Sequence, residues 1–187
     1  SKQLFLLKRL KKDGLGTAYV DGFKWALKKK FNYIFEMDAD FSHNPKDIKI
    51  ILEQILVNDY DMSIGSRYLN GINVVNWPLS RIILSYTASV YVKLITRMKI
   101  QDSTSGYVCY KKTVLESIDL DNIKFTGYAF QIEMKYKAYL KNFKIIEVPI
   151  IFSDRKHGVS KLNGSIISEA IFGVLSMRIK KIFNIKF

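Results

Sequence analysis

Short apolar segments alternate with longer segments of helical periodicity along this chain, and this alternation limits the possible folds more than any other sequence feature. A β-branched and aromatic run at 33–37 precedes a segment at 45–56 whose apolar residues keep the helical spacing, and another apolar run follows at 61–66. Such alternation is typical of an α/β domain with a largely parallel sheet flanked by helices. A length of 187 residues supports one sizeable core and is too short for two ordinary domains.

The remaining segments fit the same pattern. We expect strands where short apolar runs are bounded by turn residues, at 4–7, 33–37, 61–66, 107–110 and 144–152. We expect helices where apolar residues recur at helical spacing, after Gly14, from Pro45, and at 78–98, 130–139 and 166–187. Pro149 lacks an amide donor, which predicts that the last strand lies at a sheet edge.

The charge balance predicts an anionic partner. Lys and Arg number 30 against 17 Asp and Glu, which gives a net charge of +13. The excess lies at the two ends, since residues 1–30 carry nine basic and two acidic side chains and residues 155–187 carry seven and one. A nucleic-acid-binding module is one alternative, but the sequence has no RNA-recognition aromatic motif, zinc-ligand set or helix-turn-helix pattern. We therefore expect the partner not to be a nucleic acid.

The rarest residue types give further limits. Cys109 is the only cysteine, so no intrachain disulfide can form and a reducing cytoplasm is favoured. No segment reaches the ~20 apolar residues that a membrane-spanning helix needs. His43 and His157 are the only histidines, and both are expected at the surface rather than as metal ligands. Glu133 is expected to be an exposed helix carboxylate, with a buried ion pair or a role in a site as the alternative.

Asp38 and Asp40 directly follow the apolar run at 33–37. Side chains two residues apart on an extended segment point to the same side, so these carboxylates can share a divalent cation. Such a metal can neutralise a diphosphate leaving group. The alternative is a solvated pair that caps the junction between strand and loop. A position beyond the carboxyl end of a strand, where open α/β sheets bind their ligands, favours the metal.

Cationic side chains near turns have the chemistry that phosphate groups need, namely Arg67, Arg81, Arg155 and Lys161. Arg67 and Arg155 each follow an apolar strand, which favours a site over an ordinary solvated charge. Gly14 and Gly16 open a helix and could present backbone N–H groups to an anion, with helix capping as the alternative.

An ordered series of motifs runs through nearly the whole chain. It comprises KDGLGTAY at 12–19, MDADFSHNP at 37–45, GSRY at 65–68, NW at 76–77, DSTSGY at 102–107, GYAFQIEM at 127–134, and EVP at 147–149 leading into 155–161. Together these motifs resemble the polyprenyl-phosphate glycosyltransferases of glycosyltransferase family 2, which are typified by dolichyl-phosphate mannosyltransferase. The resemblance implies the GT-A fold, a Rossmann-like α/β fold with a mixed, mostly parallel sheet flanked by helices.

The resemblance also implies roles for the candidate residues. Asp38 and Asp40 would hold Mg²⁺ or Mn²⁺ against the diphosphate of a nucleotide sugar, and Ser42 occupies a position that often supplies a further ligand in relatives. The acceptor phosphate would be bound by Arg67, Arg81 and Ser85. The donor phosphates would be bound by Gly14, Gly16, Arg155 and Lys161 together with the metal-binding pair. The catalytic residues implied are Asp38, Asp40 and Arg67.

The activity implied is the inverting, metal-dependent transfer of a hexose, mannose from GDP-mannose, to a polyprenyl or dolichyl phosphate. A lipid monophosphate is already an anionic nucleophile and needs little general-base help, which agrees with the shortage of histidine. The metal and the cations would then stabilise the departing diphosphate and align the acceptor. One alternative is a UDP-glucose-type polyprenyl-phosphate glycosyltransferase. Another is an inactive remnant or a regulatory subunit of this family.

The two ends of the chain carry separate expectations. The strands that bind the nucleotide base in relatives do not occur before Leu4, so we expect an N-terminally truncated catalytic domain at residues 1–164. The segment 165–187 alternates apolar and cationic side chains and is expected to be an amphipathic helix. That helix would either lie in a membrane interface or pack on its own domain. The first possibility implies a peripheral protein at the cytoplasmic face of a membrane.

Overall fold

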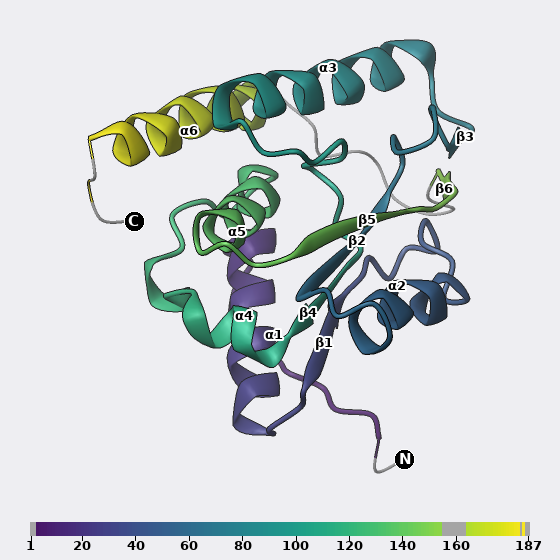
Figure 1. The fold of residues 1–187 in the computed structure, drawn as a ribbon, viewed down its shortest axis with the longest axis vertical. Helices are drawn as coiled ribbons and strands as arrows, with labels where there is room; N and C mark the ends of the chain where they lie inside the picture. Colours follow the sequence, from purple (N-terminus) through teal and green to yellow (C-terminus); the bar gives the residue numbers. More distant parts are fainter. Residues whose placement is uncertain (1–2, 155–163, 184, 186–187) are drawn as a thin grey trace.

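A four-stranded mixed sheet forms the centre of the computed structural model, which describes residues 3–154, 164–183 and 185 (Figure 1). The strands are β1 (Tyr33–Glu36), β2 (Met62–Ser66), β4 (Val108–Lys111) and β5 (Ile145–Pro149), in the spatial order β1-β4-β2-β5. A small second sheet pairs β3 (Val74–Val75) with β6 (Phe152–Ser153) in parallel. The predicted α/β fold with a mixed sheet is therefore confirmed.

The direction of the strands refines the prediction of a mostly parallel sheet. β1, β2 and β5 run in the same direction, and β2 pairs with β5 in parallel. β4 lies between β1 and β2 and is antiparallel to both, so two of the three pairings in this sheet are antiparallel. Strand pairing joins segments far apart in the sequence, and the local apolar pattern that predicts a strand says nothing about its direction.

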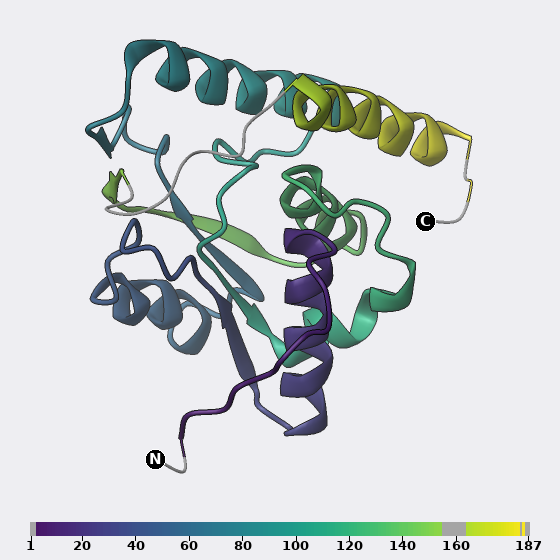
Figure 2. The ribbon, with the colours of Figure 1, turned by 180° about the vertical axis from the view of Figure 1, so that it is seen from behind.

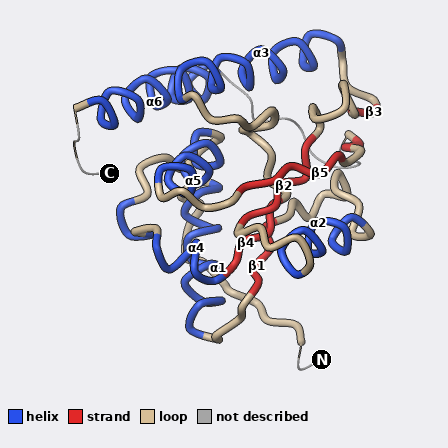
Figure 3. Tube along the Cα trace, in the orientation of Figure 1, coloured by secondary structure: helices blue, strands red, loops and turns tan. Residues whose placement is uncertain are grey.

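Helices cover both faces of the sheet and one of its ends (Figures 1 and 2). On one face lie α1 (Leu15–Lys28), α4 (Lys112–Ser117) and α5 (Ala129–Leu140), with a short 3₁₀ helix, η1, at Leu120–Asn122. On the opposite face lies α2 (Asp47–Leu56). Across the end of the sheet lie α3 (Leu79–Thr96) and α6 (Gly164–Ile182), which pack against each other. Figure 3 shows the helices surrounding the strands in this way.

The core divides into two clusters because successive side chains of a strand point to opposite faces of the sheet. Val108 and Tyr110 of β4 belong to the larger cluster, which α1, α4, α5 and α6 complete. Cys109 of the same strand belongs to the smaller cluster, together with Ile51 and Ile55 of α2. Ile51 and Ile55, one helical turn apart, therefore lie on the face of α2 that packs against the sheet.

The predicted strand at 4–7 is wrong. Leu4 and Leu6 are exposed, no strand forms there, and the segment instead packs along α1. The rings of Phe5 and Trp25 lie 5.0 Å apart, and Arg9 forms an ion pair of 2.9 Å with Asp21. A strand needs a neighbour for its backbone hydrogen bonds, and an apolar run without one adopts another conformation.

The other predicted elements are present with small shifts of their ends. The prediction that Pro149 marks a sheet edge is confirmed, because β5 pairs only with β2 within the described part of the chain. The predicted strand at 144–152 divides into β5 and β6, which belong to different sheets. Among the described residues, no helix is both long and apolar enough to span a bilayer.

Candidate functional site

A pocket of about 410 Å³ lies where the carboxyl ends of β1 and β2 meet α3 and α6. Four residues predicted from the sequence belong to its lining or reach it: Asp38 follows β1, Arg67 follows β2, and Arg81 and Ser85 lie on the first turns of α3. The fold thus brings together side chains that are up to 47 residues apart in the sequence. Their convergence beyond the carboxyl ends of strands is the arrangement expected of a ligand site in an α/β sheet.

The loop after β1 holds the two aspartates through several polar contacts. The hydroxyl of Tyr19 donates to Oδ1 of Asp38 at 3.4 Å. Both the amide and the hydroxyl of Ser42 donate to Oδ1 of Asp40, at 3.1 and 2.5 Å. The hydroxyl of Ser42 is therefore directed at Asp40, which gives Ser42 a visible role in orienting that carboxylate.

His43 also fixes this loop, and its predicted surface position is wrong. The side chain is 4% exposed, and its ring lies 4.7 Å from that of Tyr107 and 5.1 Å from that of Phe152. Nδ1 accepts a hydrogen bond of 3.1 Å from the amide of Asp38. Burial and the nearby Arg67 lower the pKa of His43 to about 4, which keeps the ring neutral and able to accept. His157 lies outside the described residues.

The donor set around Asp38 suits a hard divalent cation that keeps other oxygen ligands. Within residues 3–154, 164–183 and 185, no group of three or more His, Cys, Asp or Glu side chains could enclose a metal ion. Mg²⁺ in phosphate-transferring sites is commonly held by one or two carboxylates plus the phosphates of the substrate. Asp38 lines the pocket and Asp40 follows two residues later in the same loop, which fits that mode of binding and does not fit a closed structural site.

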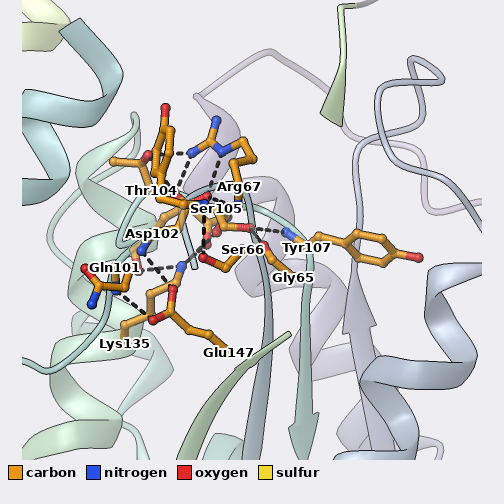
Figure 4. A network of polar contacts seen from close by, with 12 residues as sticks. Gly65, Ser66, Arg67, Gln101, Asp102, Thr104, Ser105, Tyr107, Lys135 and Glu147 are labelled. Atoms are coloured by element: carbon orange, nitrogen blue, oxygen red, sulfur yellow. Dashed lines mark hydrogen bonds and ion pairs between the residues drawn. The ribbon is translucent and has the colours of Figure 1, made fainter. Parts of the chain in front are cut away.

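Arg67 is anchored by the buried carboxylate of Asp102 (Figure 4). Its Nε and Nη2 donate to the two carboxylate oxygens of Asp102 at 2.7 and 2.6 Å, and its backbone amide donates to Oδ2 at 2.9 Å. Nη2 also donates to the hydroxyl of Thr104 at 2.8 Å. Burial raises the pKa of Asp102, but the interactions with Arg67 and Lys135 together lower it below its usual value, so the carboxyl group stays ionised. Arg67 therefore reaches the pocket with its direction set by Asp102.

The loop that carries Asp102 is itself held from two sides. Glu147 of β5 accepts from the amides of Gln101 and Asp102 at 2.7 and 2.8 Å. The buried ammonium group of Lys135 on α5 donates to the carbonyl of Ser105 at 2.7 Å. Asp102, Ser105 and Glu147 fall within motifs of the sequence, whereas Gln101 and Lys135 fall outside them, and the sequence assigned a role to none of these residues. The available signals were Lys135, which directly follows the 127–134 motif, and Glu147 among the apolar residues of 145–150.

Arg81 projects from the first turn of α3 toward the same pocket. Its guanidinium carbon lies 3.9 Å from the centre of the Trp77 ring, a distance at which a cation interacts strongly with an aromatic face. Nη1 also donates to a carboxylate oxygen of Asp154 at 2.8 Å. The stacking holds the flexible arginine side chain over the pocket, where Ser85 lies one turn further along the helix.

An apolar wall continues the pocket away from these polar groups. It is formed by side chains of α3, α5 and α6, namely Leu84, Ala88, Tyr91, Val92, Ile132, Ala170 and Ile171. The hydroxyl of Tyr91 donates to the carbonyl of Ile171 at 3.0 Å and so links α3 to α6 along this wall. The pocket thus has a cationic end and an apolar end, which suits an amphipathic ligand.

Close packing against the loop at Phe125 and Thr126 explains why glycine occupies positions 14 and 16. A Cβ atom on Gly16 would lie 2.6 Å from the carbonyl oxygen of Phe125, and one on Gly14 would lie 2.8 Å from Cβ of Thr126. Gly14 also has a φ of 99°, which disfavours any other residue. The amide of Gly16 donates to the carbonyl of Thr126 at 2.8 Å, so it is used within the fold. Neither glycine lines the pocket.

Two further predictions have different outcomes. Glu133 is buried rather than exposed, because α5 packs against α1 and α6 and shares the larger core cluster with side chains of the sheet. It accepts from the amides of Lys124 and Phe125 and forms an ion pair of 3.0 Å with Lys137, which is the alternative considered from the sequence. Arg155 and Lys161, the predicted donor-phosphate ligands, lie outside the described residues.

Curated relatives match this chain over most of its length. It is 42% identical over 178 residues to the polyprenol monophosphomannose synthase of Mycolicibacterium smegmatis, covering 95% of this chain and 67% of that protein. It is 41% identical over 169 residues to the undecaprenyl-phosphate mannosyltransferase of Micrococcus luteus, covering 90% of this chain and 69% of that protein.

Solved structures and a family profile point in the same direction. Glucosyl-3-phosphoglycerate synthase of Mycobacterium tuberculosis superimposes with a TM-score of 0.64 at 13% identity, covering 90% of this chain and 56% of that one. Its complex with Mn²⁺ and UDP-glucose gives the same TM-score at 14% identity. The chain therefore spans little more than half of these solved proteins, and the likeness shows the GT-A fold alone.

The profile described as glycosyl transferase family 2 matches residues 1–119. With these relatives at above 40% identity, the chain belongs to glycosyltransferase family 2.

Proposed function

We propose that this protein transfers mannose from a nucleotide sugar to a polyprenyl phosphate. The observation that carries the proposal is the two-ended pocket, in which Arg67, Arg81 and Ser85 face a wall of apolar side chains from α3, α5 and α6. A phosphate monoester on an isoprenoid chain has the matching shape and polarity. The names of the two curated relatives, a polyprenol monophosphomannose synthase and an undecaprenyl-phosphate mannosyltransferase, support the same acceptor and sugar.

In this proposal the acceptor phosphate is the nucleophile. One of its oxygens forms a bond to the anomeric carbon while the bond from that carbon to the donor diphosphate breaks, which inverts the configuration. The cationic end of the pocket orients the phosphate, because guanidinium and hydroxyl groups donate to phosphate oxygens. Arg67 and Arg81 are both held in place before the substrate arrives, by Asp102 and by Trp77. Such preorganisation lowers the barrier by avoiding reorganisation during the reaction.

Asp38 and Asp40 are the residues that would hold Mg²⁺ or Mn²⁺. When bound there, a divalent cation supplies charge neutralisation for the departing diphosphate. Tyr19, Ser42 and His43 keep the two carboxylates and their loop in position. The solved glucosyl-3-phosphoglycerate synthase that binds Mn²⁺ with UDP-glucose supports a divalent ion in this fold.

For the donor we propose GDP-mannose, with a UDP-hexose as the second candidate. The resemblance to mannosyltransferases favours GDP-mannose, whereas the UDP-glucose complex of a protein with the same fold favours the alternative. Gly14 and Gly16, proposed from sequence to contact the donor, would act by allowing α1 to approach the loop at Phe125 and Thr126. Arg155 and Lys161 remain proposed ligands of the donor phosphates.

We also propose that α3 and α6 lie on the cytoplasmic surface of a membrane, where a polyprenyl phosphate is found. Both helices expose large apolar side chains, on α3 Leu79, Ile83, Tyr86, Val90 and Leu94, and on α6 Phe172, Leu175, Ile179 and Ile182. Lys180 and Lys181 lie in the last turn of α6 and suit anionic headgroups. The opposite side of α6, with Val174 and Met177, is buried in the core, so the helix both packs on its domain and exposes an apolar face. For the proposed domains, residues 1–164 would carry the reaction, and 165–187 would contact the membrane together with α3.

The direct test is transfer of labelled sugar from a panel of GDP-mannose, GDP-glucose, UDP-glucose and UDP-galactose to undecaprenyl phosphate. We expect GDP-mannose to give labelled lipid that requires Mg²⁺ or Mn²⁺. The same assay on a form extended upstream by its native coding sequence tests the proposed truncation, because activity in the extended form alone would show that the donor site needs those residues. Absence of transfer in both forms would overturn the proposed activity and favour the inactive or regulatory alternative.

A further inference from the structure

The most completely buried cation near the pocket is Lys135, at the centre of α5 (Figure 4). Its side chain is 0% exposed, and its Nζ donates to the carbonyl of Ser105 at 2.7 Å and to the carbonyl and Oε1 of Gln131 at 3.3 and 3.2 Å. An ammonium group has three donors, and these three acceptors use all of them. Burying a charge is unfavourable unless it is fully paired, so the position of Lys135 demands an explanation.

The contact with Ser105 fixes one end of a loop whose other end is fixed by Glu147. Glu147 accepts from the amides of Gln101 and Asp102, at 2.7 and 2.8 Å. At the Lys135 end, the hydroxyl of Ser105 also donates to the carbonyl of Gly65 at 2.6 Å, which ties the loop to the end of β2. The loop at 101–106 is therefore clamped between α5, β2 and β5.

The clamped loop carries the groups that direct Arg67. Asp102 receives three hydrogen bonds from Arg67, and Thr104 receives a fourth. Thr104, Ser105 and Gly106 also line the pocket. A movement of this loop would move the Arg67 guanidinium relative to Arg81 and Ser85, and with it the position at which a phosphate binds.

We infer that Lys135 is a positioning residue for the transfer reaction. It clamps the 101–106 loop, so that Asp102 and Thr104 hold Arg67 in the pocket. This inference rests on the proposed function for its kinetic consequence, while the clamp itself is a property of the fold. Lys135 does not line the pocket. Loss of its ammonium group should therefore act on the reaction only through Arg67.

Lys137 provides a matched control on the same helix. Its side chain is 5% exposed, and its Nζ donates to the carbonyl of Asn122 at 3.1 Å and pairs with Glu133 at 3.0 Å. It therefore matches Lys135 in residue type, helix and burial, but none of its partners lines the pocket. Each of the substitutions Lys135→Met and Lys137→Met removes one buried ammonium group. They differ in the segment that loses a hydrogen bond, which is the 101–106 loop for Lys135 and the segment at Asn122 for Lys137.

The clamp is tested by amide hydrogen exchange, which needs no substrate. In Lys135→Met we expect exchange across 101–107 to accelerate by at least about tenfold relative to wild type, whereas Lys137→Met should accelerate exchange around 119–125 and leave 101–107 unchanged. Glu147→Gln is the second variant, since its amide can accept only one of the two bonds at Gln101 and Asp102, and it should loosen the same loop. Unchanged exchange at 101–107 in both Lys135→Met and Glu147→Gln would overturn the inference.

The kinetic role is tested by a double-mutant cycle with Arg67→Lys, measuring kcat/KM for a short-chain polyprenyl phosphate such as farnesyl phosphate. We expect Lys135→Met alone to lower kcat/KM by about 100-fold, the effect of a misplacement of about 1 Å, and by less than about twofold in the Arg67→Lys background. Lys137→Met should have no such coupling. If the fold-changes in kcat/KM caused by Lys135→Met and by Arg67→Lys instead multiply in the double variant, Lys135 does not act through Arg67. If wild type transfers no sugar, the proposed function fails, and hydrogen exchange alone then decides whether the clamp exists.

Discussion

At the scale of single residues, the site depends on side chains that are held by neighbours before any ligand binds. Arg67 is directed by Asp102 and Arg81 by Trp77. Asp40 receives two hydrogen bonds from Ser42, and the amide of Asp38 donates to His43. Each of these contacts fixes a functional group through a neighbouring side chain. Changes to the holding residues should therefore be as informative as changes to the functional groups.

Substitution of Asp40 tests the proposed metal site. Asp40→Ala should lower metal-dependent transfer by at least about 100-fold, because a bound cation contributes several kcal/mol of charge stabilisation in the transition state. It should also weaken Mn²⁺ binding measured by isothermal titration calorimetry. Asp121→Ala removes an exposed carboxylate on η1 and is the control, with transfer and Mn²⁺ binding unchanged. Wild-type affinity for Mn²⁺ in a folded Asp40→Ala protein would contradict the assignment.

The buried His43 makes stability depend on pH. Its pKa is about 4 in the folded protein against 6.5 for an unperturbed histidine, so the unfolded chain binds the proton more readily. The free energy of unfolding is therefore fully retained above pH 6.5 and should fall by about 1.4 kcal/mol per pH unit between pH 6.5 and 4.

His43→Asn separates this contribution from that of the carboxyl groups, because Oδ1 of asparagine can still accept from the amide of Asp38 but does not titrate. Urea denaturation of both proteins at pH 7, 5.5 and 4.5 measures the difference. The stability lost by wild type on acidification should exceed that lost by His43→Asn, and equal losses would show that the pKa of His43 is the same in the folded and unfolded protein.

At the scale of elements, close helix contacts and exposed helix faces have separate roles. The start of α1 approaches the loop at Phe125 and Thr126 so closely that only glycine fits at position 16. On α6, Gly173 allows a similar approach to the ring of Phe125. The loop before α5 is therefore held between two helices, and this packing places α6 beside α3 across the end of the sheet.

A pair of glycine substitutions in α1 tests the first contact. Gly16→Ala should lower the free energy of unfolding by about 1–3 kcal/mol, because its Cβ atom would lie 2.6 Å from a backbone oxygen. Gly22→Ala in the same helix meets nothing within 4 Å and should stabilise the protein by up to about 1 kcal/mol. Urea denaturation measures both values, and a neutral Gly16→Ala would show that the loop at Phe125 moves away easily.

Exposed apolar residues on α3 and α6 make membrane binding testable. Leu94→Ser and Phe172→Ser combined should reduce sedimentation with vesicles of phosphatidylcholine and phosphatidylglycerol by about tenfold or more, since each buries a large side chain on binding. Leu56→Ser on α2 changes an exposed leucine on another side of the molecule and serves as the control. Lys181→Glu should weaken binding only to vesicles that contain the anionic lipid. Equal sedimentation of all these proteins would remove the proposed membrane surface.

At the scale of the whole molecule, stability should be highest in the centre of the four-stranded sheet. β4 and β2 each have a strand on both sides, whereas β1 and β5 each have one within the described residues. Native-state hydrogen exchange should therefore be slowest for the paired amides of β2 and β4 and much faster for residues 3–13, which lie exposed along α1. Exchange at 3–13 as slow as in β4 would contradict this order of stabilities.

The sequence by itself determined the type and order of most elements, because apolar spacing depends only on neighbouring residues. It also determined the family and the position of Asp38 at the end of a strand. Only the tertiary structure decided that β4 lies antiparallel between β1 and β2, that residues 4–7 form no strand, and that His43, Glu133 and Lys135 are buried. It also decided that Arg67 is held by Asp102, from a loop that Lys135 and Glu147 clamp. Strand pairing, burial and ion pairing each join residues far apart in the chain, so the energy that selects them appears only when distant segments meet.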